Sequence, residues 1–185
     1  MKNQIRIIGG RYRSRLLSFS SEPGLRPTPG RVRETLFNWL QHDISDSLCL
    51  DLFAGSGALG LEAASRGAER VVQVEENYKV CKIIKQNVLN LGTEKVEVVR
   101  ADVMKFLSNE SQSFHLVFLD PPFGEGLIPA CCQLLEQKGW LNQEAKIYIE
   151  SEKGLDIVGL PESWECLQSK KTDEVGYHLF QRGGG

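Results

Sequence analysis

The sequence predicts an α/β fold, in which a doubly wound, mostly parallel sheet carries helices on both faces. Apolar runs of strand length alternate with segments of helical spacing from residue 48 to residue 150. A glycine-rich segment follows the first of these runs directly, as in nucleotide-binding α/β folds. Near the end of the chain, two β-prone runs around a turn-prone segment predict a closing antiparallel hairpin. With 185 residues, the chain has room for one such domain and an appendage.

The appendage is the basic N-terminal segment. Residues 5–19 alternate apolar and basic side chains, and we predict a β-hairpin with Arg11, Arg13 and Arg15 along one face. The first 33 residues carry a net charge of +7, against −9 for the rest of the chain. A basic arm on an acidic body is typical of proteins that bind nucleic-acid phosphates. A solvated hairpin whose arginines only maintain solubility would have the same composition.

A helix is predicted between this arm and the sheet. Thr28 and Pro29 are residue types favoured as N-cap and first-turn proline, and apolar residues follow at helical spacing. Arg31 and Arg33 would then lie in the first turn, where each cation opposes the helix dipole by about 0.3–1 kcal/mol. A phosphate bound at that helix end would explain both arginines, and Arg26 would join the same patch.

The remaining elements follow from apolar spacing. Strands are predicted at residues 48–53, 71–75, 96–99, 115–120 and 145–150, and the closing hairpin at 166–171 and 177–181. Helices are predicted at 58–65, at 80–91 with Gly92 as C-cap, and at 128–137. We therefore divide the chain into an N-terminal RNA-binding arm and helix at 1–45, a sheet domain at 46–182, and a flexible glycine tail at 183–185.

The first candidate site is the glycine-rich segment. Residues 55–60 match the pattern G-x-G-x-x-G, and Glu75 lies where an acid that holds a ribose is expected. This pattern alone leaves a nicotinamide or flavin cofactor open. However, Asp51 precedes the glycines within the strand, where it can meet a cationic amino group, and no second phosphate-binding feature follows. Both observations favour S-adenosylmethionine, which has an ammonium group, a ribose and an adenine but no phosphate.

The second candidate site is Asp120-Pro121-Pro122-Phe123, at the end of an apolar strand. A carboxylate and a backbone carbonyl can accept the hydrogens of an exocyclic amine, while an aromatic ring stacks on a planar base. Ligands of such sheets bind at the carboxyl ends of the strands, where Asp51, Glu75, Asp102 and Asp120 all fall. Each residue alone suits a structural role, but their joint placement predicts methyl transfer to a nucleic-acid amine.

Other classes of protein fit the sequence less well. No apolar run approaches the roughly 20 residues of a membrane span, and the basic N-terminus has no apolar signal core. We therefore expect a cytoplasmic protein without membrane association. The five cysteines include no C-x-x-C pair and the three histidines are scattered, so we assign no metal.

The chain resembles the class I S-adenosylmethionine-dependent methyltransferases, and closely the bacterial RsmD family, which methylates a guanine of 16S ribosomal RNA at N2. The resemblance covers nearly the full length. Its family-specific part is N-terminal and comprises Ile7-Ile8-Gly9-Gly10, Arg26-Pro27-Thr28, Arg31-Val32-Arg33-Glu34 and Leu36-Phe37-Asn38-Trp39-Leu40. The glycine loop and the Asp120–Phe123 segment are shared by many methyltransferases. Phe123 stands where tyrosine is also common, a change that keeps stacking and loses a hydroxyl.

The resemblance implies a Rossmann-like, seven-stranded fold and a role for each site residue. In the catalytic segment Asp120, Pro121, Pro122 and Phe123, the Asp120 carboxylate and the Pro121 carbonyl would orient N2 and Phe123 would stack on the guanine. The cofactor-binding set would be Asp51, Phe53, Ala54, Gly55, Ser56, Gly57, Glu75, Asp102, Val103 and Asp120, with Glu75 on the ribose and Asp102 on the adenine amine. The RNA-binding set would be Arg11, Arg13, Arg15, Arg26, Thr28, Arg31 and Arg33.

The reaction implied converts S-adenosylmethionine to S-adenosylhomocysteine and methylates 16S rRNA, with a small-subunit assembly particle as the expected partner and a monomeric enzyme. An alternative is a DNA adenine-N6 or cytosine-N4 methyltransferase, although the chain has no room for a sequence-reading domain. A noncatalytic RNA-binding assembly factor would use the basic arm alone. A nicotinamide oxidoreductase would use the glycine loop alone.

Overall fold

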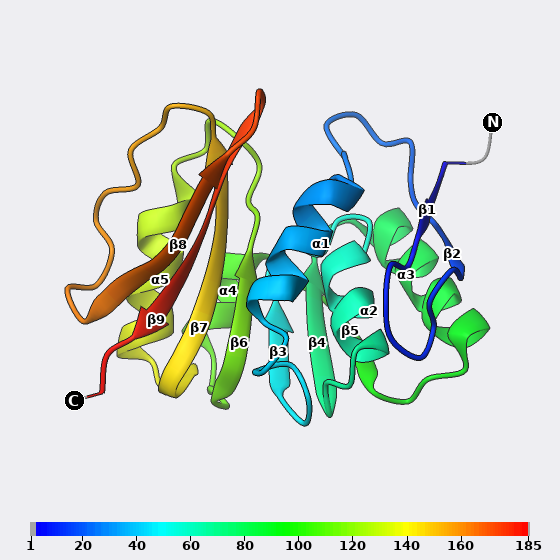
Figure 1. Ribbon diagram of the computed structural model, residues 1–185, viewed down its shortest axis with the longest axis horizontal. Coiled ribbons are helices and arrows are strands. Elements are labelled where there is room, and N and C mark those ends of the chain that lie inside the picture. Colours follow the sequence, from blue (N-terminus) through cyan, green and yellow to red (C-terminus); the bar gives the residue numbers. More distant parts are fainter. Residues whose placement is uncertain (1–2, 185) are drawn as a thin grey trace.

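The computed structural model describes residues 3–184 and has a seven-stranded sheet at its centre (Figure 1). The strands are β3 (Leu48–Asp51), β4 (Arg70–Glu75), β5 (Val96–Arg100), β6 (Phe114–Leu119), β7 (Leu141–Glu152), β8 (Trp164–Lys171) and β9 (Val175–Arg182). Their order across the sheet is β5-β4-β3-β6-β7-β9-β8. The first five in this order are parallel, whereas β9 is antiparallel to β7 and to β8. The predicted mostly parallel sheet with a closing antiparallel hairpin is confirmed.

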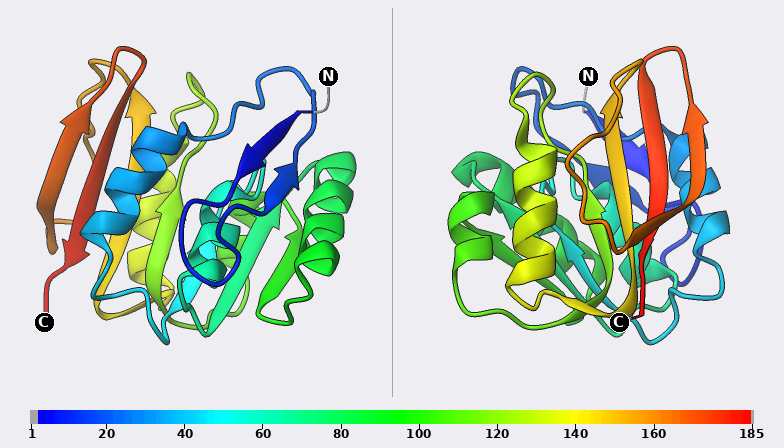
Figure 2. Two further views of the ribbon diagram at one scale, coloured as in Figure 1. Left: turned by 45° about the vertical axis from the view of Figure 1, so that its right-hand side comes forward. Right: turned by 90° about the vertical axis from the view of Figure 1, so that its left-hand side faces the viewer.

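Helices cover both faces of this sheet, as Figures 1 and 2 show. On one face lie α1 (Gly30–Trp39), α2 (Ala58–Ser65) and α3 (Tyr78–Leu91), and on the other lie α4 (Val103–Ser108) and α5 (Leu127–Gln137). Phe118 of β6 packs in the core under α1 and α2, whereas its neighbour Val117 packs in the core under α5. This alternation is the period of two that a strand imposes. Within residues 3–184, no helix is long and apolar enough to cross a bilayer.

Most bounds of the sheet domain lie within two residues of the prediction, with two larger differences. The helix at 58–65 has the predicted bounds, and Gly92 caps α3 in the left-handed conformation, with φ 67°. Helix α4 was not predicted, because its six residues are too few to show a helical repeat of apolar side chains. Strand β7 begins at Leu141, four residues earlier than predicted, because Leu141 pairs with Phe114 ahead of a register irregularity.

The N-terminal hairpin is shorter than predicted. Strands β1 (Gln4–Arg6) and β2 (Leu16–Ser18) pair antiparallel, but each has only three residues. Arg11, Arg13 and Arg15 therefore lie in the connecting loop and not along a strand face. The physical reason is Gly10, whose φ is +76° and whose α-carbon passes so close to α2 that an added Cβ would lie 2.0 Å from the Ser65 carbonyl oxygen. The loop thus turns to pack on the end of α2.

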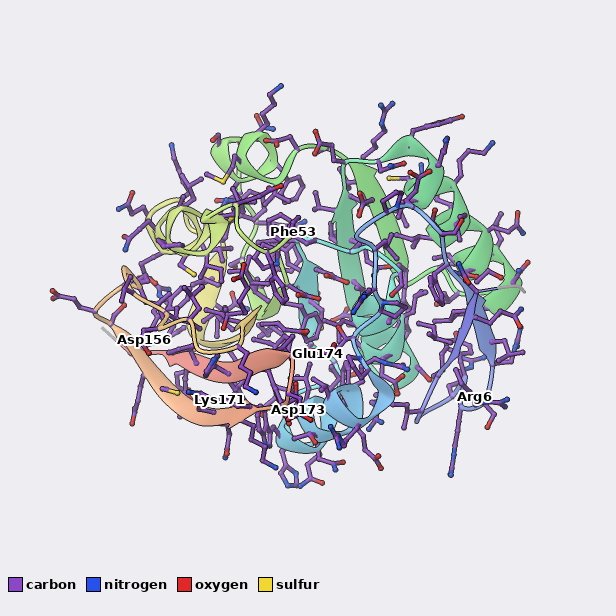
Figure 3. All side chains as sticks on the ribbon, turned by 90° about the horizontal axis from the view of Figure 1, so that it is seen from above. Arg6, Phe53, Asp156, Lys171, Asp173 and Glu174 are labelled. Carbon is purple, nitrogen blue, oxygen red and sulfur yellow. The ribbon has the colours of Figure 1, made fainter. Side chains whose placement is uncertain are left out.

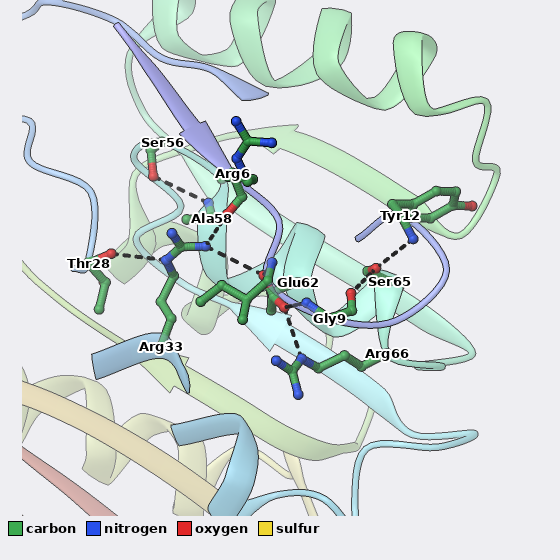
Figure 4. A network of polar contacts seen from close by, with 12 residues as sticks. Arg6, Gly9, Tyr12, Thr28, Arg33, Ser56, Ala58, Glu62, Ser65 and Arg66 are labelled. Atoms are coloured by element: carbon green, nitrogen blue, oxygen red, sulfur yellow. Dashed lines mark hydrogen bonds and ion pairs between the residues drawn. The ribbon is translucent and has the colours of Figure 1, made fainter. Parts of the chain in front are cut away.

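A fully buried carboxylate, Glu62, joins the N-terminal segment to α2 (Figure 4). Its Oε1 accepts hydrogen bonds from the Gly9 N–H at 2.8 Å and from the Arg66 Nε at 2.9 Å. Its Oε2 accepts from the Ile8 N–H at 3.0 Å and faces the Arg33 Nη1 at 3.5 Å. Two backbone amides and two guanidinium groups therefore compensate the desolvation of one charge.

Arg33 and Thr28 differ from their predicted placement at the start of α1. Arg33 is 4% exposed, and besides Glu62 it donates to the carbonyl oxygens of Arg6 and Thr28, each at 3.1 Å. This burial contradicts the surface position predicted for Arg33. Helix α1 begins at Gly30, with Pro29 at the N-cap position and no side-chain cap. The N-cap prediction for Thr28 is wrong, because its hydroxyl points towards carboxylates at the sheet edge.

The hydrophobic core continues across the predicted boundary at residue 45. Ile7 and Leu17 of the arm and Leu36 of α1 belong to the same buried cluster as Leu61 of α2. The division into residues 1–45 and 46–182 therefore describes proposed roles and not separate cores. At the other end of the chain, the Gly183 N–H donates to the Ser163 carbonyl oxygen at 2.6 Å, so the chain is held there, whereas residue 185 lies outside the described residues.

We predict that Glu62→Ala lowers the free energy of unfolding by about 3–5 kcal/mol, because it leaves two guanidinium groups without their buried counter-charge. Glu62→Gln keeps an acceptor oxygen and is expected to lose less. Urea unfolding measures both. Glu97→Ala is the matched control, since Glu97 belongs to an exposed ion pair with Arg70 and should cost less than about 1 kcal/mol. Equal losses in Glu62→Ala and Glu97→Ala would contradict the role of the Glu62 cluster.

Candidate active site

An open cleft of about 1170 Å³ lies at the carboxyl ends of the parallel strands. Figure 3 looks down on this edge of the molecule, with Phe53 and Glu174 towards its middle and Arg6 at the far side. The predicted site residues that line the cleft are Arg26, Thr28, Phe53, Ala54, Gly55, Ser56, Glu75, Asp102, Val103, Asp120, Pro121, Pro122 and Phe123. The glycine loop and the Asp120–Phe123 segment thus share one cavity, as the sequence predicted.

Asp51 lies beneath the glycine loop and does not itself line the cleft. The side chain is buried, and its Oδ2 accepts hydrogen bonds from the Gln73 Nε2 at 2.9 Å and from the Gly60 N–H at 3.3 Å. Burial raises the pKa of Asp51 to about 6, and these two hydrogen bonds oppose that shift. The third glycine is needed for close packing, because a Cβ at Gly60 would lie 2.4 Å from the Gln73 amide. Asp51 and Gln73 therefore fix the start of α2 against β4.

Glu75 ends β4 and shapes the other side of the loop. Its Oε2 accepts the Gly55 N–H at 3.0 Å, and its Oε1 accepts the Asn77 N–H at 2.8 Å. Asp102 follows the end of β5 and is the N-cap of α4, since its Oδ1 accepts the Lys105 N–H at 2.9 Å. Both carboxylates line the cleft and are held in place by backbone donors before any ligand arrives.

Asp120 belongs to a cluster with two residues that the sequence analysis missed, Glu150 and Tyr148. The Thr28 hydroxyl lies 3.5 Å from the Asp120 Oδ2 and 3.5 Å from the Glu150 Oε2. The Tyr148 hydroxyl donates to the same Glu150 oxygen at 2.9 Å. Glu150 closes the predicted strand 145–150, so the strand-end rule that selected Asp120 applies to it as well.

The surroundings of this cluster disfavour the ionised forms of the Asp120 and Glu150 carboxyl groups. Burial, then the charge of Glu150 and that of Asp51, raise the pKa of Asp120 well above its usual range. Burial also raises the pKa of Glu150, while the hydroxyls of Tyr148 and Thr28 oppose that shift. Carboxyls with raised pKa values in a cleft are typical of functional sites. The cluster is therefore suited to accept hydrogen-bond donors from a ligand.

Phe123 presents an accessible ring beside these carboxylates. Its side chain is 50% exposed, which excludes a role in the hydrophobic core. Pro121, by contrast, is buried and fixes the backbone that follows Asp120. A planar base that enters the cleft would find an aromatic face next to a pair of acceptors.

The structure separates the predicted RNA-binding residues into two groups. Arg26 and Arg31 are exposed at the cleft end of the molecule, where the Arg26 guanidinium lies 4.0 Å from the Glu174 carboxylate. The loop with Arg11 and Arg15 packs at the opposite end of α2, since the Arg11 N–H donates to the carbonyl of Ser65. Helix α2, about 12 Å long, runs from the glycine loop of the cleft to Ser65, and the Arg15 guanidinium donates to the Asn90 carbonyl oxygen of α3 at 2.6 Å.

Comparison with known proteins shows the family of the chain. Residues 5–181 match the protein family described as Conserved hypothetical protein 95. The chain is 46% identical over 179 residues to Ribosomal RNA small subunit methyltransferase D of Escherichia coli (strain K12), covering 97% of this chain and 90% of that protein. The chain belongs to the RsmD family. The relative of the same name in Haemophilus influenzae is 43% identical over 184 residues, covering 97% of this chain and 95% of that protein.

Solved structures extend the comparison beyond the RsmD family. A protein of Escherichia coli superposes with a TM-score of 0.90 at 45% identity, covering 99% of this chain and 100% of that one. An RNA methyltransferase from Salinibacter ruber, in complex with S-adenosyl-L-homocysteine, has a TM-score of 0.67 at 16% identity, covering 85% of this chain and 94% of that one. Its identity is low enough that it shows the common fold alone. The predicted Rossmann-like methyltransferase fold is confirmed.

A more distant sequence relative is named for the base that it modifies. An rRNA N(6)-adenosine-methyltransferase of Drosophila melanogaster is 30% identical over 102 residues, covering 53% of this chain and 48% of that protein.

We predict that Asp51→Asn changes how stability depends on pH. In the folded protein the pKa of Asp51 is raised to about 6. Its contribution to the free energy of unfolding is therefore fully present below about pH 4 and is lost as the pH rises through 6. Because Asn does not ionise, the variant should gain about 3 kcal/mol relative to the wild type between pH 4 and pH 7, at about 1.4 kcal/mol per unit. Urea unfolding at each pH measures this difference. Asp156→Asn, at an exposed loop position, should run parallel to the wild type.

Proposed function

We propose that the chain is an S-adenosylmethionine-dependent methyltransferase that modifies the exocyclic N2 of a guanine in 16S rRNA. Membership of the RsmD family supports methyl transfer to ribosomal RNA. The observation that carries the proposal is the shared cleft, in which the glycine loop faces the Asp120–Phe123 segment. A methyl donor on one side and an amine on the other would meet at the Asp120 carboxylate.

The residues of the glycine-loop side fit S-adenosylmethionine. A Cβ added at Gly55 would meet only the Phe53 carbonyl oxygen, 3.9 Å away, so the backbone there is open to a ligand. Glu75 would hold the ribose hydroxyls and Asp102 the adenine amine, and both already line the cleft. The protein of Salinibacter ruber, which has this fold, binds the demethylated product. Asp51 lies under the loop and accepts the Gly60 N–H. We propose that it attracts the amino group of S-adenosylmethionine by its charge and also holds the loop in the conformation that receives this group.

The chain's own residues would align the target amine and exclude water. When bound, the cofactor supplies a methyl group that its sulfonium already makes electrophilic. The lone pair of an exocyclic guanine nitrogen is delocalised into the ring, so the amine is a poor nucleophile. Asp120 and the Pro121 carbonyl would accept its two N–H groups and favour a pyramidal nitrogen, while Phe123 stacks on the base. Alignment and preorganised acceptors can each contribute several kcal/mol.

The RNA substrate must reach both groups of exposed arginines if both take part. Arg26 lines the cleft and Arg31 lies in the first turn of α1, whereas the loop with Arg11, Arg13 and Arg15 packs at the Ser65 end of α2. We propose a small-subunit assembly particle as the substrate. The monomeric state and the cytoplasmic location remain predictions. Within residues 3–184 the structure holds no group of three or more side chains suited to bind a metal.

Three alternatives predict other outcomes. Methylation of adenine N6 or cytosine N4 would use the same acceptors, and one distant relative methylates adenosine in rRNA. A noncatalytic assembly factor would bind RNA without methylating it, but such a protein has no need of a preformed glycine loop. An oxidoreductase would need to hold a dinucleotide phosphate, and the site offers acidic groups instead.

The deciding experiment is methyl transfer from tritiated S-adenosylmethionine to unmethylated 16S RNA, free and in small subunits, followed by nucleoside analysis. Label in N2-methylguanosine is expected, with a preference for subunits. Label in methyladenosine or on DNA would overturn the target base. Binding of the cofactor without any transfer would support the noncatalytic alternative.

We predict that Asp120→Ala abolishes turnover, with a loss of at least about 100- to 1000-fold, because the amine loses its charged acceptor. Affinity for S-adenosylmethionine, measured by calorimetry, should change little, because Glu75, Asp102 and the glycine loop still hold the cofactor. Asp120→Asn keeps one acceptor oxygen and should retain part of the activity. Unchanged turnover in Asp120→Ala would remove Asp120 from the mechanism.

We predict that Arg31→Gln weakens RNA binding and reduces the slope of log affinity against log salt by about one unit, because one phosphate contact is lost. Filter binding at several salt concentrations measures both quantities. Lys138→Gln removes the same charge at the end of α5, away from the cleft, and should leave the slope unchanged. An identical slope in Arg31→Gln and the wild type would refute the phosphate contact.

A further inference from the structure

Glu150 lies beside Asp120 at the edge of the sheet. Strands β6 and β7 are parallel with Leu119 opposite Ile149, so Asp120 and Glu150 occupy the next matched positions and project from the same face. The Thr28 hydroxyl contacts both carboxylates, at 3.5 Å each. Glu150 is 5% exposed and lines both the large cleft and a smaller apolar cavity of about 190 Å³ next to Phe123. The two carboxylates therefore form one acceptor pair at the place proposed for the target base.

The two oxygens of Glu150 have different surroundings. Oε2 accepts from the Tyr148 hydroxyl at 2.9 Å and from the Thr28 hydroxyl at 3.5 Å. Oε1 accepts no hydrogen bond from any residue in the range 3–184. Oε1 is not among the fully enclosed polar atoms, and Glu150 lines the cleft, so a ligand there can bring a donor to this oxygen. The protein thus holds one oxygen and leaves the other for the base.

The bases that carry an exocyclic amine differ in the atom next to it. Guanine has N1–H beside its N2 amine, so its Watson–Crick edge presents adjacent donors. Adenine has the N1 lone pair beside its N6 amine, and cytosine has the N3 lone pair beside its N4 amine. A second carboxylate at this position attracts the guanine edge and repels the other two. The neighbour of the catalytic carboxylate is therefore placed to decide which base is accepted.

We propose that Glu150 accepts the N1–H of the target guanine while Asp120 accepts its N2–H, so that this carboxylate pair selects guanine over adenine and cytosine. The inference rests on the proposed function and deepens it. Thr28 and Tyr148 are positioning residues, since their hydroxyls fix the orientation of Glu150 and do not touch the base. Burial raises the pKa of Glu150, and the Tyr148 hydroxyl, which donates to it at 2.9 Å, together with the Thr28 hydroxyl, whose one hydrogen is shared with Asp120, opposes that shift and favours the ionised, accepting form.

Glu150→Gln tests this assignment by reversing one hydrogen bond. The hydroxyls of Thr28 and Tyr148 should hold the amide oxygen in the place of Oε2 and turn the amide NH₂ towards the base, where it meets the guanine N1–H donor to donor. The substrates are small subunits reconstituted with 16S RNA that carries guanosine or 2-aminopurine riboside at the methylated position. 2-Aminopurine keeps the N2 amine but has a lone pair at N1.

For the wild type, kcat/KM is expected to be at least about 100-fold higher with guanosine than with 2-aminopurine riboside. In Glu150→Gln the guanosine rate should fall and the preference should shrink below about tenfold. Glu152→Gln, two positions along the same strand, makes the same charge change and should keep the wild-type preference. Thr28→Val should weaken the preference in the same direction, and Thr28→Ser should restore it.

Three results would overturn the inference. An unchanged preference in a folded Glu150→Gln or Thr28→Val variant, with or without an equal loss of rate on both substrates, would assign Glu150 a structural role. A wild type that accepts 2-aminopurine riboside as well as guanosine would show that N1–H is not read. If the wild type forms no N2-methylguanosine in subunits, the proposed function fails and this inference fails with it. The first two results leave the proposed function intact.

Discussion

Glu62 lies in the middle of α2 with its side chain fully buried, and it receives hydrogen bonds from three separate segments of the chain. An isolated carboxylate in that position would cost several kcal/mol, so α2 can pack against the sheet only when the arm and α1 are in place. The Ile8 and Gly9 amides come from the arm, and the Arg33 guanidinium comes from α1. One charge thus makes the N-terminal segment part of the sheet domain's core.

The geometry of the active site depends on the same interaction. Arg33, held by Glu62, also donates to the Thr28 carbonyl oxygen, which fixes the backbone just before α1. That backbone places the Thr28 hydroxyl between Asp120 and Glu150. A buried cation that does not line the cleft therefore positions a hydroxyl at the catalytic edge. This explains why arginine occurs in the first turn of α1, where the helix dipole disfavours it.

Sequence patterns predicted what depends on short-range periodicity and turn chemistry. The alternating strands and helices, the left-handed cap at Gly92 and the shared edge of the glycine loop and Asp120 all follow from local rules. The sequence analysis placed Arg33 on the surface because its counter-charge, Glu62, is 29 residues away in the chain and no local pattern links them. Glu150 was within reach of the strand-end rule, but no motif surrounds it to draw attention.

The buried carboxylates of this chain differ in what surrounds their oxygens, and this difference separates structure from function. Both oxygens of Glu62 are occupied, two guanidinium groups balance its charge, and it is closed to the cleft. The charges that act on Asp120 are those of Glu150 and Asp51, both negative, and its protein donor is a single hydroxyl. The fold therefore opposes charge at Asp120, and donors from a bound base would relieve that opposition. The Asp120 and Glu150 carboxylates are shielded from water but are not paired with cations. They can therefore accept hydrogen bonds from the target amine, whose nitrogen must become nucleophilic.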